Sequence, residues 1–247
     1  MRKIYLSIVI PAYNEELNIS STLQEIVDYL KTKDYQYEII VIDDGSTDKT
    51  VEAAYKIAPA FNTFTLLKND TNHGKGYTVK RGILAANGEL ILFMDADNST
   101  RIGQLDKLIA VIMDGNDIAI ASRRVPGATI ETYQPLHRNI LGNIYIMLSG
   151  VILGTKIRDY NCGFKLFKKE AAKSIFSRVT RNDWSFDSEV IYLAARLSFS
   201  IKEVPITWKD KKETSKVKPL RDGIKSFLGL VKIRMQKREL FKLNIKE

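Results

Sequence analysis

The sequence predicts an α/β protein built on a doubly wound, mostly parallel sheet with helices on both faces. Short apolar runs rich in Ile and Val recur along the first half of the chain, as in strands that are covered on both sides. Segments with apolar residues at helical spacing separate these runs, which gives the β-α-β alternation typical of the class. The 247 residues can bury a substantial core, and a hydrophobic content of 45% is ordinary for a globular protein.

Each element is predicted from its own pattern. Strands are predicted at residues 7–11, 37–43, 90–94 and 118–121. Helices are predicted at residues 16–30, 49–58 and 77–86. In the first helix Leu23, Ile26 and Leu30 recur at the spacing of one helical face. In a sheet of this kind, functional residues are expected at the carboxyl ends of the strands.

Acidic residues follow two of these strands directly. Asp43 and Asp44 end the second strand, and Asp95 and Asp97 follow the third. Carboxylates are ligands that Mg²⁺ and Mn²⁺ prefer, and such ions often share them with a substrate diphosphate. These residues therefore predict a site that neutralises a leaving diphosphate. The alternative is that they form turns or cap helices, as Asp often does.

A Gly-Lys-Gly segment at residues 74–76 precedes the third predicted helix. Glycines at a helix N-terminus let backbone amides approach an anion. The segment lacks the spacing of the known dinucleotide and P-loop motifs. A phosphate-binding loop and a plain turn both remain open.

Positive charge is concentrated near the C-terminus. Residues 201–247 contain 14 Lys and Arg against 6 Asp and Glu, so a chain with a net charge of +9 has a nearly neutral body. A basic tail predicts an anionic partner. Phe227, Leu228 and Val231 form an apolar stripe flanked by basic residues, which predicts a helix at a membrane surface. Docking of this helix on the protein body is the alternative.

A second segment also predicts attachment to a membrane. Residues 139–155 contain no charged residue, and their length lies at the lower limit for crossing a bilayer. Ile140, Ile144 and Met147 share one helical face opposite small and polar residues. This pattern predicts an interfacial helix, and a buried core helix is the alternative.

Cysteine content and the N-terminus exclude other classes. Cys162 is the sole cysteine, so neither an internal disulfide nor a zinc site of clustered cysteines is expected. Pro11 and Asn14 end the first apolar run early, which favours a strand over a signal peptide.

Taken together, the motifs resemble a family 2 glycosyltransferase of the GT-A fold. The resemblance is carried by IVIPAYNEE (8–16), VIDDGSTDKT (41–50), NHGKGYTVKRGI (72–83), MDADNST (94–100), ASRR (121–124), RDYNCGFKLFKKEAA (158–172) and WSFDSEV (184–190). The last two segments are most similar to those of dolichyl-phosphate β-glucosyltransferases, and dolichol-phosphate mannosyltransferases come second.

The resemblance implies roles for particular residues. Nucleotide-sugar binding is implied for Pro11, Ala12, Tyr13, Glu15, Ile42, Asp44, Lys75, Asp95, Ala96 and Asp97. Mg²⁺ or Mn²⁺ would be bound by Asp95 and Asp97, with Asp97 the principal ligand. Catalytic roles are implied for Asp97, Asp187, Arg123, Arg138 and Lys216.

Two features depart from these relatives. Mannosyltransferases of this kind often place a Gln where this chain has Ser99, which weakens the mannosyl interpretation. The glucosyltransferase relatives commonly carry an N-terminal membrane anchor, and we expect none from the segment at the start of this sequence.

The implied reaction is the inverting transfer of a hexose to a polyprenyl phosphate, with UDP-glucose the favoured donor and GDP-mannose the second. A saccharide or protein hydroxyl acceptor is the alternative, with Asp187 as the base. A non-catalytic nucleic-acid-binding module is a third hypothesis, but the tail lacks an aromatic stacking platform, and we expect no nucleic-acid partner.

We expect a glycosyltransferase domain over residues 1–218, with an interfacial helix at 137–155. Residues 219–247 would form a basic amphipathic tail that binds an anionic membrane surface. With no signal peptide and no clear transmembrane span expected, the predicted location is peripheral, on the cytoplasmic face of a membrane.

Overall fold

The computed structural model describes residues 3–132, 136–209 and 219–235, and for 132, 136–139 and 219–226 the backbone only. A seven-stranded sheet forms its centre, in the order β3-β2-β1-β4-β7-β5-β8. The strands are β1 (Leu6–Ala12), β2 (Tyr37–Asp43), β3 (Phe64–Lys68), β4 (Leu90–Met94), β5 (Ile118–Ser122), β7 (Phe164–Lys168) and β8 (Ile201–Pro205). Strands β6 (Thr129–Thr132) and β9 (Thr207–Lys209) pair in a small second sheet.

The sheet is parallel except at one strand. β1 pairs in parallel with β2 and β4, and β5 pairs in parallel with β8. β7 lies between β4 and β5 and runs antiparallel to both. All four predicted strands are present, and the predicted mostly parallel α/β fold is confirmed.

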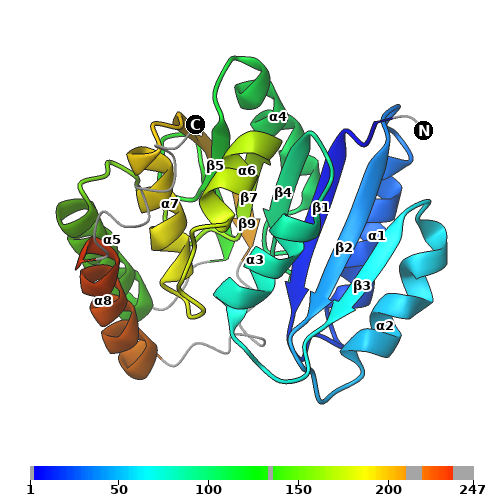
Figure 1. Ribbon diagram of the computed structural model, residues 1–247, viewed down its shortest axis with the longest axis horizontal. Helices are drawn as coiled ribbons and strands as arrows, with labels where there is room; N and C mark the ends of the chain where they lie inside the picture. Colours follow the sequence, from blue (N-terminus) through cyan, green and yellow to red (C-terminus); the bar gives the residue numbers. More distant parts are fainter. Residues whose placement is uncertain (1–2, 133–135, 210–218, 236–247) are drawn as a thin grey trace, which may run out of the picture.

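Helices cover both faces of the sheet (Figure 1). They are α1 (Ile19–Leu30), α2 (Thr50–Ile57), α3 (Lys75–Ala85), α4 (Leu105–Met113), α5 (Leu136–Leu153), α6 (Lys169–Phe176), α7 (Phe186–Arg196) and α8 (Pro219–Met235). One core layer joins the sheet to α1, α2 and α4. The other joins it to α3, α6 and α7. This two-sided burial explains why the strands read as continuous apolar runs.

Helices α5 and α8 lie side by side at the edge of the molecule, beyond α7 (Figure 1). Leu230 and Ile233 of α8 are fully buried in the second core layer. Of the described helices, none is both long and apolar enough to span a bilayer. Residues 210–218 and the end of the predicted tail, 236–247, lie outside the described residues.

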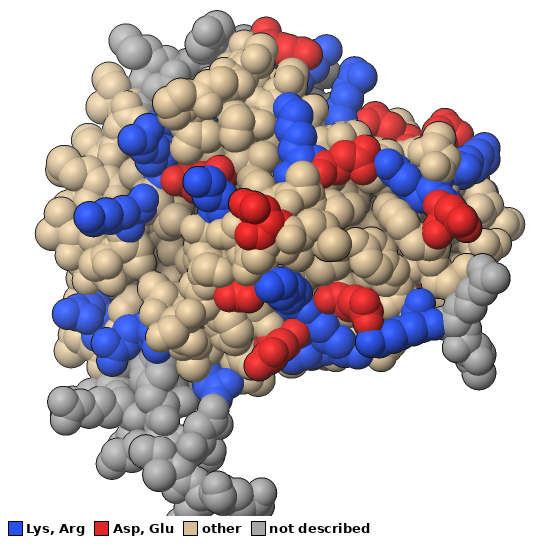
Figure 2. Space-filling view, turned by 90° about the horizontal axis from the view of Figure 1, so that it is seen from above, with Lys and Arg blue, Asp and Glu red and all other residues tan. Residues whose placement is uncertain are grey.

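Surface charge on the body is mixed. On the face drawn in Figure 2, Lys and Arg side chains lie among Asp and Glu side chains. This distribution agrees with the nearly neutral charge counted for the first 200 residues.

Candidate active site

The carboxyl ends of β1, β2, β4 and β5 lie on one edge of the sheet, because these strands run in the same direction. Each of them ends in a loop that carries residues singled out from the sequence.

The loop after β4 holds two carboxylates close together. The amide of Asp95 donates to the carbonyl of Gly163 at 2.9 Å, which fixes the loop against the segment before β7. Asp97 accepts the Ser99 amide at 2.9 Å. Burial raises the pKa of the Asp97 carboxyl, and the charge of Asp95 raises it further. Two neighbouring carboxylates in a partly buried loop favour a bound cation.

Lys75, in the first turn of α3, places a positive charge beside these carboxylates. Its Nζ lies 2.7 Å from Asp95 Oδ1 and 4.8 Å from the centre of the Trp184 ring. Burial acts to lower the pKa of Lys75, but Asp95 and Asp187 outweigh it and hold the pKa above its usual value. Lys75 is therefore a cation held over an aromatic face beside the acidic loop.

Gly163 determines where the Asp95 carboxylate can lie. A Cβ at Gly163 would be 1.9 Å from Asp95 Oδ2, far inside van der Waals contact. The glycine of the RDYNCGFK segment thus makes room for the acidic side chain.

A buried ion pair lies behind this group. Lys165 on β7 and Asp187 in the first turn of α7 form a salt bridge with side chains only 1% and 3% exposed. Lys165 Nζ also donates to the Cys162 carbonyl at 2.8 Å. Burial raises the pKa of Asp187, while Lys165 and Lys75 oppose that shift. Asp187 is thus a buried partner of Lys165, and the N-cap of α7 is Ser185.

Arg123 follows β5 and is held by Asp159. Its Nε and Nη2 donate to the two oxygens of Asp159 at 2.7 and 2.8 Å, a bidentate pair. Asp159 is 1% exposed, and Arg123 outweighs the effect of burial to lower the pKa of its carboxyl. The Trp208 ring covers the guanidinium at 5.1 Å. The orientation of Arg123 is therefore fixed before any ligand binds.

Asp44, after β2, organises the loop that leads into α3. Its carboxylate accepts the amides of His73 and Gly74, at 3.0 and 2.9 Å, and the side-chain amide of Asn69 at 2.7 Å. Its neighbour Asp43 has one buried oxygen, Oδ1, without a partner in the part of the chain that the structure describes.

The glycines of the Gly-Lys-Gly segment allow close backbone packing, in addition to any approach of an anion to the backbone amides. A Cβ at Gly74, where φ is +97°, would lie 2.5 Å from the Asn182 carbonyl, and one at Gly76 would lie 2.2 Å from that of Arg181. The Gly76 amide already donates to Asn182 at 2.8 Å, as the Gly74 amide does to Asp44. The turn interpretation thus explains the glycines, whereas Lys75 is the member that faces the acidic loop.

The structure brings most of the predicted site residues to this edge. Those at the ends of β1, β2, β4 and β5 or on α3 and α7 are Pro11, Ala12, Tyr13, Glu15, Ile42, Asp44, Lys75, Asp95, Ala96, Asp97, Arg123 and Asp187. Glu15 accepts the Asn18 side-chain amide at 2.8 Å, and Tyr13 is 36% exposed. The side chain of Arg138 and all of Lys216 lie outside the described residues.

Two aromatic residues were given no site role from the sequence. Phe93 of β4 lies 5.4 Å from Lys75 Nζ and 5.7 Å from Lys165 Nζ, so one ring contacts both cations. The Trp184 ring lies against Lys75 Nζ and is 41% exposed. A strand-end aromatic beside an acidic motif carries no periodic signal that would have identified it.

The residues present fit a shared divalent ion. Among the described residues no group of three or more Asp, Glu, His or Cys side chains is arranged to hold a metal. Mg²⁺ and related ions are commonly bound by one or two carboxylates, with substrate phosphates and water as the other ligands. Asp95 and Asp97 offer that kind of site.

Comparison with known proteins identifies the family. The family described as "Glycosyl transferase family 2" matches residues 7–176. The dolichyl-phosphate beta-glucosyltransferases of Dictyostelium discoideum and Saccharomyces cerevisiae are each 34% identical to the chain, and that of Homo sapiens is 33% identical. Each of these alignments covers 94% of this chain and 75% of the relative.

Solved structures agree on the fold. A glucosyl-3-phosphoglycerate synthase from Mycobacterium tuberculosis, in complex with Mn²⁺, UDP-glucose and phosphoglyceric acid, matches with a TM-score of 0.71. Its sequence is 18% identical, and the match covers 94% of this chain and 80% of that one.

Proposed function

Because the chain belongs to glycosyl transferase family 2, as the motifs predicted, we propose that it transfers glucose from UDP-glucose to a dolichyl or other polyprenyl phosphate, with inversion at the anomeric carbon. The names of its relatives support glucose as the sugar and a lipid phosphate as the acceptor. The observation that carries the proposal is the meeting of Asp95, Asp97 and Lys75 at the edge where the sheet ends.

The donor diphosphate would lie over the acidic loop. Asp97, with Asp95 beside it, would hold Mg²⁺ or Mn²⁺, and the bound ion would offset the charge that develops on the leaving diphosphate. Lys75 adds a positive charge on the α3 side of the loop. The nucleoside would occupy the ends of β1 and β2, with contacts from Pro11, Ala12, Tyr13, Glu15, Ile42 and Asp44.

The acceptor needs positive charge more than it needs a base. A phosphate monoester is largely ionised at neutral pH, so its oxygen can attack the anomeric carbon directly. Arg123, already oriented by Asp159, offsets the repulsion between acceptor phosphate and donor diphosphate. Arg138 and Lys216 are proposed to add charge at the same phosphates.

Asp187 is better suited to positioning than to proton abstraction. Its side chain is 3% exposed and is paired with Lys165, so an acceptor hydroxyl has little access to it. This pairing disfavours the hydroxyl-acceptor alternative, which needs Asp187 within hydrogen-bond reach of the acceptor.

Membrane attachment is proposed through α5 and α8. The apolar face of α5 points outward: Ile144, Met147 and Val151 are 45%, 61% and 79% exposed. The opposite side of α5 packs on the protein body, since Ser149 is fully buried and Tyr145 hydrogen-bonds to Ser188 of α7. A helix with its apolar side toward solvent fits a lipid surface.

Helix α8 has two apolar faces. One buries Leu230 and Ile233 in the core, while Phe227, Leu228 and Met235 are 40%, 52% and 71% exposed. Thus docking on the body and an outward apolar stripe occur in the same helix.

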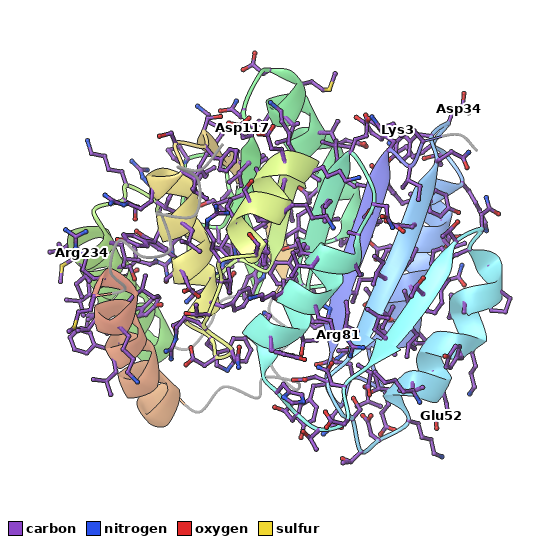
Figure 3. The ribbon with its side chains drawn as sticks, viewed as in Figure 1. Lys3, Asp34, Glu52, Arg81, Asp117 and Arg234 are labelled. Atoms are coloured by element: carbon purple, nitrogen blue, oxygen red, sulfur yellow. The ribbon has the colours of Figure 1, made fainter. Side chains whose placement is uncertain are left out.

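Basic residues flank the outward stripe of α8. Lys232 and Arg234 are exposed beside it, and Arg234 lies at the outer edge of the molecule in Figure 3. Basic side chains complement the anionic lipids of the cytoplasmic leaflet, where we place the protein as a peripheral enzyme.

The test is a transfer assay with purified protein. The protein is incubated with radiolabelled UDP-glucose, Mg²⁺ or Mn²⁺ and a short polyprenyl phosphate, and GDP-mannose is run in parallel. The expected result is label in an organic-extractable product that requires both lipid phosphate and metal and that Asp97→Asn abolishes. Transfer to a soluble saccharide in the absence of any polyprenyl phosphate would contradict the proposal, as would the lack of a lipid product from every UDP- or GDP-hexose tested.

A further inference from the structure

Two consecutive arginines follow β5, and their guanidinium groups have different partners. Arg123 is neutralised by Asp159 through two hydrogen bonds. Arg124 forms no ion pair with any carboxylate in the described part of the chain, and its one side-chain hydrogen bond there goes to a neutral amide, Asn143 on α5. A guanidinium has five N–H donors, so Arg124 retains donors for a ligand.

Helix α5 is shaped to receive this guanidinium. Arg124 Nη1 donates to Asn143 Oδ1. A Cβ at Gly142 would lie 3.0 Å from Arg124 Nη2, so a larger residue there would press on the guanidinium. The contact holds Arg124 between the loop after β5 and the helix.

Arg124 meets α5 at Asn143, which is exposed beside the outward apolar face of the helix. One helical turn from Asn143, at i−3 and i+4, are Ile140 and Met147, which are 50% and 61% exposed. The location combines an apolar surface with a cation that forms no ion pair among the described residues. An anionic head on an apolar chain is the ligand chemistry that fits both.

The charges nearby favour an anion at this place. Burial lowers the pKa of Arg124 and the neighbouring charge of Arg123 lowers it further, although Asp159 opposes the shift. Asp159 already pairs with Arg123, so two adjacent cations share one close carboxylate. A phosphate monoester would bring the missing negative charge.

We propose that Arg124 binds the phosphate of the polyprenyl acceptor while the first isoprene units lie on the apolar face of α5 at Ile140 and Met147. The proposal rests on the proposed function, because it assigns the acceptor side of the same site. Arg124 is thus a ligand of the acceptor phosphate, and Arg123 stays paired with Asp159 beside it.

The test compares Arg124→Gln with the wild type, using farnesyl phosphate as a soluble acceptor and UDP-glucose as donor. The KM for farnesyl phosphate is expected to rise roughly 10- to 100-fold, the loss typical of a charge-assisted hydrogen bond. The KM for UDP-glucose should change by less than about twofold. Arg124→Lys should lie between, because a Lys keeps the charge and loses the bidentate geometry. Lys107→Gln, an exposed cation on α4, is the matched control and should leave both constants unchanged.

Binding measurements separate this proposal from the proposed function. Farnesyl phosphate is titrated calorimetrically into both proteins, and the thermal midpoints are compared to verify folding. If the wild type binds farnesyl phosphate but transfers no glucose, the proposed function fails, and weaker binding by Arg124→Gln still supports the site.

Two results would overturn the proposal. One is that Arg124→Gln leaves the KM and the affinity for farnesyl phosphate unchanged but binds vesicles of phosphatidylcholine and phosphatidylglycerol more weakly. That result would make Arg124 a bilayer-headgroup ligand. The other is an equal rise in KM for donor and acceptor.

Discussion

At Gly163 the absence of a side chain creates the space that the Asp95 carboxylate fills. Gly163→Ala is expected to displace that carboxylate and to lower kcat/KM for glucose transfer by about 100-fold, since errors of about 1 Å in an active site cost that much. The measurement is steady-state transfer at fixed metal concentration. Gly103→Ala is the control, because a Cβ at Gly103 meets nothing within 4 Å. Equal activity of the two variants would show that the position of Asp95 does not matter.

The Lys165–Asp187 pair makes a second prediction at the scale of single residues. Lys165→Met leaves the Asp187 carboxylate buried without its partner, which is expected to lower the free energy of unfolding by about 3–5 kcal/mol. The double variant Lys165→Met/Asp187→Leu removes both charges and should regain much of that loss. Urea denaturation measures both. A single variant as stable as the wild type would contradict a buried ionic pair.

Among the elements, the start of α3 depends on Asp44. Asp44→Asn replaces one acceptor oxygen with a donor that faces the amides of His73 and Gly74. The free energy of unfolding is expected to fall by about 2–4 kcal/mol, because the buried charged acceptor of these amides is lost. Asp70→Asn in the same loop changes an exposed residue and should have little effect. If urea denaturation gives the same stability for both variants, Asp44 does not organise the loop.

The strands also show which elements the sequence patterns could predict and which they could not. The four predicted strands are found because each is a continuous apolar run ended by polar or turn residues. Strand β7 has no such run: FKLFK contains Lys165, whose burial depends on a partner 22 residues away, at Asp187. The edge strand β3 is only partly buried, so its apolar signal is weak.

The residues of the candidate site also divide into those that sequence patterns predict and those whose contacts depend on the fold. Strand-end acidic motifs predicted Asp95 and Asp97, since adjacency in the chain suffices for them. The pairing of Arg123 with Asp159 and the approach of Trp184 to Lys75 depend on packing of distant segments. Helical periodicity predicted the apolar face of α5 but not whether it points inward or outward, which only the packed structure shows.

At the scale of the whole molecule, α5 and α8 form a pair that exposes apolar side chains to solvent. Met147→Glu/Val151→Glu places two charges on that face and is expected to reduce co-sedimentation with phosphatidylglycerol vesicles at least about tenfold. Met113→Glu is the control, because Met113 is 73% exposed on α4, on the other side of the sheet. Equal loss in both would mean that binding to vesicles follows net charge and not this face.

The central claim is that segments far apart in the sequence build one site for a nucleotide diphosphate at the edge of the sheet. Calorimetric titration of UDP-glucose, with and without Mn²⁺, tests it most directly. We expect Mn²⁺ to strengthen binding by at least about tenfold in the wild type. Asp97→Asn should lose this metal dependence, and Lys75→Met should bind UDP-glucose more weakly. Binding of UDP-glucose that is indifferent to Mn²⁺ and unchanged in both variants would contradict it.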